Sequence, residues 1–275
     1  MSAESSGSPA VPPDTAHLDQ LLSAVPPAVL DVPRSAWGFG GLHGGLALSL
    51  VASSMRSRAA DQQLRSITAQ FHRPIRETFA IDSQVIRLGR SAGAVQATGS
   101  GPDGLCLTAS AIFGADQPGL PPSCAPEPPD VPQPQSVESV DTVDLHVPVL
   151  AEVDVRPIGS IRPYAQGAEP VMTAWMRVRG TDAPLAPHGL VFFLDALPPS
   201  YTAVLAEHRP VPTLELSAHL TANRPASSWV LVRSRTVRAT DGGWVTELVD
   251  LWDTEGVHLA CAQQLRLAAA VRSPE

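Results

Sequence analysis

Two segments of this chain read as the same strand written twice. Residues 105–113 (LCLTASAIF) and 257–265 (VHLACAQQL) share one pattern at a spacing of 152 residues. The dipeptide Arg-Pro at 73–74 recurs at 224–225, which is a spacing of 151 residues. Nearly equal spacings over separate segments indicate that one unit of about 150 residues occurs twice. Whatever fold the chain adopts must therefore be built from two similar halves.

The two copies differ in one polar residue. At the spacing of the repeated strand, Ile112 in the first copy corresponds to Gln264 in the second. A strand that is apolar in one copy and carries an amide in the other predicts a single polar site in the second half.

Composition excludes several classes of protein. The chain has 275 residues, is 44% hydrophobic and carries a net charge of -8 without a basic stripe, so we expect no nucleic-acid partner. No apolar run approaches the roughly 20 residues that span a bilayer. Three cysteines without framework spacing suit a reducing, cytoplasmic compartment. The histidines do not cluster at ligand spacing, so we expect no metal. Residues 1–16 are typical of a disordered tail and not of a signal peptide.

The order of elements also repeats. In the first half a glycine-rich segment leads into an apolar helix (GFGGLHGGLALSLVASSM), which four strands follow, at 66–72, 79–88, 91–98 and 105–113. In the second half a helix within 189–205 follows a strand at 171–180 and precedes strands at 213–221, 229–238, 244–252 and 257–267. A curved antiparallel sheet wrapped round one apolar helix buries such a helix on nearly all sides.

Between the halves the composition changes. Residues 115–148 are rich in proline, which favours extended, solvated chain and predicts a linker. We therefore divide the chain into a disordered tail (1–16), a first unit (17–114), the linker (115–148) and a second unit (149–275) that carries the candidate site.

Several segments together resemble a known family. FGGLHGGLAL, LRSITAQFHRP, WMRVRG and ACAQQLRL, in this order, resemble the type II, TesB-like acyl-CoA thioesterases, and the likeness covers most of 37–267 apart from the linker. The resemblance implies an α+β double hotdog fold, in which two antiparallel sheets, each wrapped around a long central helix, are fused as a pseudo-dimer. It also implies an acyl-CoA substrate, no cofactor and a homo-oligomer.

The resemblance assigns catalytic residues by motif. The family's water-binding Asp, Thr and Gln fall on Asp195 in GLVFFLDALPP, Thr213 in VPTLELSAHL and Gln264 in ACAQQLRL. A carboxylate can accept the proton of a water, and a hydroxyl and an amide can orient that water. The corresponding places in the first half, near Gly44, Gln62 and Ile112, keep none of these residue types, so we expect that half to be catalytically silent.

Two further expectations concern geometry. Unpaired backbone donors at the glycine-rich helix start suit an oxyanion, and we select Gly40 and Gly41 for this substrate-binding role. Strand alternation places Thr213 on the polar face of its strand, with Glu215. It places Gln264 beside small and polar residues that include Arg266, and it places Gln263 among apolar residues. A bulge could exchange the two roles, and the resemblance favours Gln264 for the site.

Two alternative functions stay open. A hotdog hydratase or dehydratase needs a paired Asp and His, but no His follows Asp195 before His208. A non-catalytic module that binds acyl groups or acyl-CoA is the other alternative. Many relatives carry Asp-His where this chain has Glu215 and Leu216, a departure that bears on substrate and rate.

Overall fold

The computed structural model describes residues 17–59, 62–117, 124–142, 147–221 and 223–269. The first half contains the elements α1 (Leu18–Ser23), β1 (Val29–Asp31), the 3-10 turn η1 (Arg34–Ala36), α2 (Gly44–Arg58), β2 (Gln63–Phe71), β3 (Thr78–Leu88), β4 (Ala92–Gly101) and β5 (Gly104–Gly114). After the 3-10 turn η2 (Pro134–Ser136), the second half contains the elements η4 (Pro148–Glu152), β6 (Val153–Pro157), β7 (Val171–Val178), α3 (Pro187–Phe193), η5 (Ser200–Val204), β8 (Thr213–Leu220), β9 (Val230–Ala239), β10 (Trp244–Trp252) and β11 (His258–Leu267).

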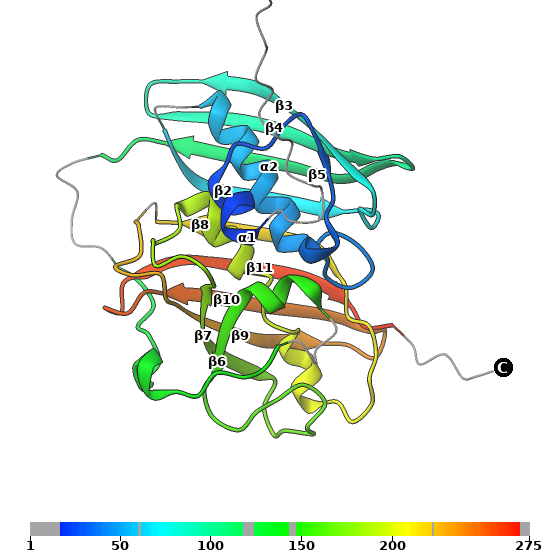
Figure 1. Cartoon of the computed structure of the whole chain (residues 1–275), viewed down its shortest axis with the longest axis vertical. Coiled ribbons are helices and arrows are strands. Elements are labelled where there is room, and N and C mark those ends of the chain that lie inside the picture. The colour runs from blue at the N-terminus through cyan, green and yellow to red at the C-terminus, as the bar shows by residue number, and fades with distance from the viewer. Residues whose placement is uncertain (1–16, 60–61, 118–123, 143–146, 222, 270–275) are drawn as a thin grey trace, which may run out of the picture.

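The described strands form one antiparallel sheet of two related halves. The sheet has eleven strands in the order β1-β3-β4-β5-β2-β8-β11-β10-β9-β7-β6. Strands β2 and β8 pair in the middle, where Thr68 lies opposite Ser217, and the same strand order runs outward on either side. Figure 1 shows the two halves stacked along the long axis of the molecule. The duplication in the sequence is therefore a pseudo-two-fold repeat in the fold.

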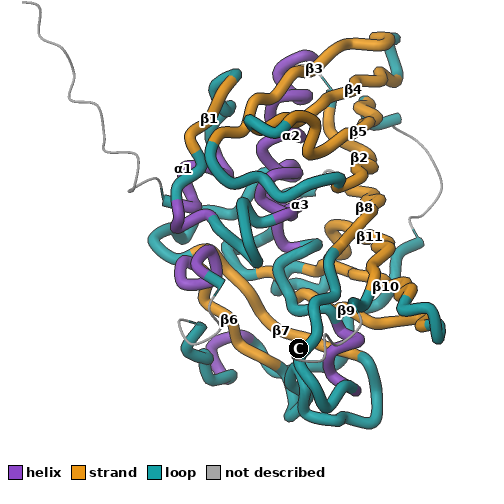
Figure 2. Tube along the Cα trace, turned by 90° about the vertical axis from the view of Figure 1, so that its right-hand side faces the viewer, coloured by secondary structure: helices purple, strands orange, loops and turns teal. Residues whose placement is uncertain are grey.

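The helices lie on one side of this sheet, as Figure 2 shows. Helix α2 is buried over most of its length, since residues 45–53 and Met55 are all shielded from solvent, whereas residues 56–58 of its last turn are exposed. Its run of Gly, Ala and Ser between leucines lets the sheet and α3 approach closely. Each half thus wraps a helix in an antiparallel sheet, which confirms the predicted α+β, double hotdog arrangement.

The second helix is shorter than predicted. The sequence predicts helix within 189–205, but α3 ends at Phe193 and a separate 3-10 turn, η5, begins at Ser200. Pro198 and Pro199 lie in the gap. Proline lacks an N–H and clashes with the preceding turn, so the helix cannot continue through these residues. The break leaves Asp195 just beyond the end of α3.

The described part of the proline-rich linker is extended but lies against the protein. The indole N–H groups of Trp252 and Trp175 donate to the carbonyl oxygens of Pro126 and Pro132 at 3.0 and 2.8 Å. Val131 and Val137 pack against a cluster of buried side chains on the face of the sheet away from α3: Trp175, Trp229, Leu231 and Trp252. Residues 124–142 thus form a strap across the outer face of the second half, in which most side chains are exposed while Pro134 and Thr142 are buried.

Some expectations lie beyond these residues. The predicted disordered tail, 1–16, falls outside the described part of the chain. Within the described part, no helix is long and apolar enough to cross a membrane.

Candidate active site

Asp195 lies where the two halves meet, between the end of α3 and the start of α2. A β-carbon added to Gly44, the first residue of α2, would lie 2.7 Å from Asp195 Oδ2. A β-carbon added to Gly45 would lie 2.6 Å from the carbonyl oxygen of Phe192. Only glycine permits this approach, and the exposed N–H groups of a helix start favour a nearby negative charge. The paired glycines of HGGL therefore bring a helix terminus of the first half against a carboxylate of the second.

Three side chains hold one oxygen of this carboxylate. Asp195 Oδ1 accepts hydrogen bonds from Thr213 Oγ1 at 3.0 Å, Gln264 Nε2 at 3.3 Å and Arg266 Nη2 at 3.2 Å. The other oxygen, Oδ2, faces Gly44. The three residues that the resemblance selected, Asp195, Thr213 and Gln264, thus lie together, and one carboxylate oxygen is fixed while the other faces the helix start.

Gln264 has one polar atom without a partner. The side chain is fully buried, and its Nε2 donates to the backbone carbonyl of Leu194 at 2.6 Å. That bond fixes which end of the amide is nitrogen. Oε1 is buried and has no hydrogen-bond partner among the described residues. Gln263 is exposed, so Gln264, which the resemblance favoured over Gln263, is the residue of the two that faces inward.

Thr213 reaches the site through an irregularity of its strand. Simple alternation groups Thr213 with Glu215, but the register shifts so that Thr213 lies opposite Arg266 while Glu215 lies opposite Leu265. The extra residue, Leu214, is a bulge, which turns Thr213 to the inner face. The predicted grouping of Thr213 with Glu215 on one face is therefore wrong, and the bulge is what brings the hydroxyl to Asp195.

A buried ion pair extends the site below Asp195, and the sequence did not identify it. Arg266 Nε lies 2.5 Å from Glu247 Oε2, in an ion pair without the alignment of a good hydrogen bond. Glu247 Oε1 accepts from the backbone N–H of Ser200, from Ser200 Oγ at 2.5 Å and from Ser234 Oγ at 3.1 Å. The inward position of Arg266 beside Gln264 was a signal in the sequence, but its partner on β10 was not.

One histidine also borders the carboxylate. His43 immediately precedes α2 and is buried, with its ring 5.2 Å from that of Phe192. Burial lowers the pKa of His43, because desolvation of the imidazolium outweighs the attraction of Asp195. The ring is therefore neutral at physiological pH, and Arg266 is the cation beside Asp195.

The two glycines that the sequence predicted for substrate binding, Gly40 and Gly41, lie before the start of α2. Gly40 has φ +81° and is exposed, and its carbonyl accepts from Arg76 Nε at 3.1 Å. Gly41 packs against the backbone of Ile75. Both belong to the tight turn that leads to α2, and the glycines that approach Asp195 are Gly44 and Gly45.

Strand register, followed across the sheet, corrects the comparison of the two halves. Each half has a bulge on its central strand, between Leu64 and Ser66 and between Thr213 and Glu215. Aligning the bulges pairs Gln264 with Ala111. The burial of the side chains agrees, because Gln264 is buried whereas Ile112 is 44% exposed and points outward. A shift of one residue moves a side chain to the other face, so the correspondence of Ile112 with Gln264 is wrong.

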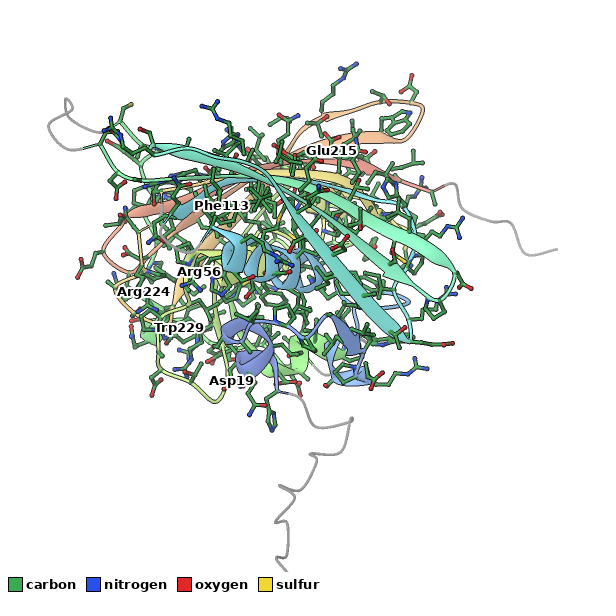
Figure 3. All side chains as sticks on the ribbon, turned by 90° about the horizontal axis from the view of Figure 1, so that it is seen from above. Asp19, Arg56, Phe113, Glu215, Arg224 and Trp229 are labelled. Atoms are coloured by element: carbon green, nitrogen blue, oxygen red, sulfur yellow. The ribbon has the colours of Figure 1, made fainter. Side chains whose placement is uncertain are left out.

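On the corrected register the two halves contrast fully. The positions that hold Thr213, Gln264, Arg266 and Glu247 in the second half correspond to buried apolar residues in the first: Leu64, Ala111, Phe113 and Val95. Figure 3 shows Phe113 between the sheet and the helix layer, whereas Glu215 lies at the outer surface. The first half therefore has no counterpart of the polar cluster.

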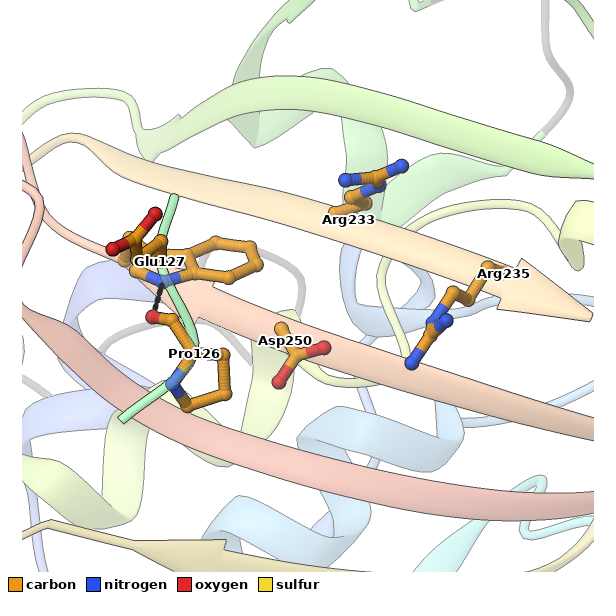
Figure 4. A pocket seen from close by; sticks show the side chains of 6 residues that line it. Pro126, Glu127, Arg233, Arg235 and Asp250 are labelled. Carbon is orange, nitrogen blue, oxygen red and sulfur yellow. Dashed lines mark hydrogen bonds between the residues drawn. The ribbon is translucent and has the colours of Figure 1, made fainter. Parts of the chain in front are cut away.

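A surface hollow lies elsewhere on the molecule. It has a volume of about 230 Å³ and is bordered by Arg233, Arg235, Asp250, Trp252 and the strap residues Pro126 and Glu127 (Figure 4). It lies on the outer face of the sheet, away from Asp195. No three His, Cys, Asp or Glu side chains gather as a metal site in the residues that the structure describes.

Comparison with known proteins places the chain in a family. Residues 33–114 match the acyl-CoA thioesterase N-terminal domain, and residues 121–268 match the acyl-CoA thioesterase C-terminal domain. The chain belongs to the acyl-CoA thioesterase family. It is accordingly a thioester hydrolase, as the sequence motifs predicted.

Solved structures agree with the fold. A candidate thioesterase II of Thermobifida fusca YX is 25% identical, with a TM-score of 0.77 over 92% of this chain and 97% of that one. A hot dog protein of unknown function from Alicyclobacillus acidocaldarius is 21% identical, with a TM-score of 0.78 over 88% and 92%. The acyl-CoA thioesterase II TesB2 of Mycobacterium marinum is 19% identical, with a TM-score of 0.70 over 92% and 98%. No curated protein matches the chain.

Proposed function

We propose that this thioesterase hydrolyses acyl-CoA by means of a water held between Asp195 and Gln264. The observation that carries the proposal is the buried, unpartnered Oε1 of Gln264 beside a carboxylate whose Oδ2 faces the start of α2. A buried acceptor without a partner costs about 1–3 kcal/mol, which a bound water relieves by donating to it. One water proton then points to Gln264 and the other to Asp195.

The chemistry follows from this arrangement. Asp195 Oδ2 takes a proton as the water oxygen bonds to the thioester carbonyl carbon. The resulting oxyanion receives the free N–H groups of the first turn of α2, at Gly44 and Gly45, where the helix dipole also favours negative charge. Collapse of the intermediate breaks the C–S bond and releases the CoA thiolate, which takes up a proton. The products are a free acid and CoA.

The choice of glycines differs from the sequence prediction. Gly40 and Gly41 were selected for their place in a glycine-rich segment, and a role in binding substrate at the turn stays a prediction. Gly44 and Gly45 are better placed for the oxyanion, because a β-carbon at either would crowd Asp195 or the end of α3.

Neighbouring glutamines offer a matched experiment. Gln264→Ala should lower thiol release by about 10²-fold or more, the loss typical when a positioned polar group is removed. Gln263→Ala, which alters the exposed neighbour, should keep the wild-type rate and the same unfolding curve. A panel of acyl-CoA substrates read with a thiol reagent supplies the measurement. Full activity of Gln264→Ala would overturn the assignment.

The same panel separates the alternatives. Tight binding of acyl-CoA without thiol release by the wild type would identify a binding module. Hydration of an enoyl-CoA without thiol release would identify a hydratase. We further expect a homo-oligomer in the cytoplasm, and a monomeric mass in solution would contradict the first of these expectations.

A further inference from the structure

We propose that Arg266 and Glu247 form a positioning pair that holds a partly balanced positive charge beside Asp195 and directs its Oδ2 toward the substrate. The inference rests on the function proposed above and extends it to two residues that do not touch the reacting atoms. Neither residue belongs to the water-binding trio of Asp195, Thr213 and Gln264.

The contacts of Arg266 leave no free end of the guanidinium. Nη2 donates to Asp195 Oδ1 at 3.2 Å, Nε pairs with Glu247 at 2.5 Å, and Nη1 donates to the backbone carbonyl of Val211 at 3.4 Å. The side chains of Arg266 and Asp195 are 7% and 8% exposed, and that of Glu247 is fully buried. A buried guanidinium whose three nitrogens each contact a protein oxygen is fixed in place and is poorly placed to bind a substrate anion.

Glu247 fixes the arginine in turn. Its Oε1 is held by the N–H and hydroxyl of Ser200 and by the hydroxyl of Ser234, which come from η5 and β9. A chain of polar contacts therefore runs from two serines through Glu247 and Arg266 to Oδ1 of Asp195. Its effect is to hold one carboxylate oxygen and leave the other toward Gly44.

The first half of the molecule is an internal control for a purely structural role. Phe113 and Val95 occupy the positions of Arg266 and Glu247 there, and both are fully buried. The fold is thus satisfied by apolar residues at these places. A buried ion pair is weak evidence for stability, because desolvation offsets its attraction. The half that has charges at these positions is the half that has Asp195, Thr213 and Gln264.

The charges around Asp195 set the expected sign. The groups that face it are neutral His43 before α2, Arg266 on β11 with Glu247 behind it on β10, and the uncharged Thr213 and Gln264. Removing Arg266 takes away the one neighbouring cation, so ionisation of Asp195 becomes harder and the acid limb of kcat/KM should move to higher pH. Removing the charge of Glu247 leaves the cation unbalanced and should move that limb to lower pH.

The decisive variant transplants the apolar pair of the first half. The double substitution Arg266→Phe with Glu247→Val should fold, because the first half packs the same two side chains, Phe113 and Val95, at these places. It should reduce kcat by about tenfold to a hundredfold and raise the acid limb by about one pH unit or more. Glu247→Gln should shift the limb the opposite way. Arg266→Lys retains the positive charge but lacks the planar, forked guanidinium. This variant should keep the acid limb of the wild-type pH profile and have a reduced kcat.

A second readout makes the test independent of turnover. Carbon-13 NMR of the Asp195 carboxyl, assigned with Asp195→Asn, follows its ionisation in the wild type and in each variant. Thiol release by the wild type tests the proposed function, whereas the NMR titration tests the positioning pair even if no acyl-CoA is hydrolysed. A double variant whose carboxyl titrates as in the wild type would overturn the proposal, as would Glu247→Gln and the double variant shifting in the same direction.

Discussion

Gly44→Ala tests the contact on which the site depends. A β-carbon at Gly44 would lie 2.7 Å from Asp195 Oδ2. Ordinary contact begins at about 3.5 Å, so the carboxylate must move by roughly 0.8 Å. The donors on Oδ1 lie at 3.0 to 3.3 Å, and such a shift stretches at least one of them beyond hydrogen-bonding range. A misplacement of about 1 Å lowers turnover about 10²-fold, so we expect kcat to fall by about 10- to 100-fold.

Gly189 is the matched control for this substitution. It follows His188 in α3 as Gly44 follows His43 in α2. A β-carbon at Gly189 would meet its nearest neighbour at 3.5 Å, which is an ordinary contact. Gly189→Ala should therefore keep the wild-type kcat and stabilise the protein by up to about 1 kcal/mol through helix propensity. Thiol release and urea unfolding of the two variants give both quantities. A Gly44→Ala enzyme with the kcat of the wild type would refute the reasoning.

Three other predictions follow from contacts already described. Thr213→Val removes the 3.0 Å bond to Asp195 and should lower kcat about 10- to 100-fold, with Thr213→Ser restoring most of the loss in the thiol assay. Burial lowers the pKa of His43 and of His188, so the unfolded chain binds more protons below pH of about 6.5. The free energy of unfolding should therefore decrease as the pH is lowered, by at most about 1.4 kcal/mol per pH unit for each ring. His188→Leu should reduce this slope in urea unfolding measured between pH of about 7.5 and about 5.5. Trp252→Phe removes the bond to Pro126 and should cost about 0.5–1.5 kcal/mol with unchanged thiol release, whereas Trp244→Phe, at a partly exposed site, should change neither; equal stability of both variants would argue against a docked strap.

Sequence reasoning succeeded where one periodic pattern decides the structure. The alternation of apolar residues located the longer strands, and the repeated Arg-Pro and terminal strands indicated two halves. The choice of Gln264 over Gln263 came from the family resemblance, because alternation grouped Gln263 with the apolar residues of β11 and Gln264 with small and polar ones. Local pattern is sufficient for a regular strand that has one buried face.

The failures have a shared cause in irregular backbone and distant partners. A bulge at Leu214 turned Thr213 inward, and the bulges on both central strands shifted the true counterpart of Gln264 from Ile112 to Ala111. Bulges insert a residue without a clear mark in composition. The pairing of Arg266 with Glu247 joins two strands at a register that hydrogen bonding of the folded sheet sets, and no spacing along the chain specifies it.

The contact of α2 with Asp195 means that both copies of the repeated unit contribute groups to one candidate site. The second copy supplies Asp195, Thr213, Gln264 and Arg266, whereas the first supplies the neutral His43 and the backbone of a helix start at Gly44. The second half alone would keep the Asp195 cluster but lack the N–H donors at the start of α2. The first half alone would keep those donors but lack the carboxylate cluster that lies beside them. Because the two halves are covalently joined, each molecule has one such helix start for each polar cluster. Covalent fusion also lets each copy diverge under its own constraint, the first for shape and the second for reactivity.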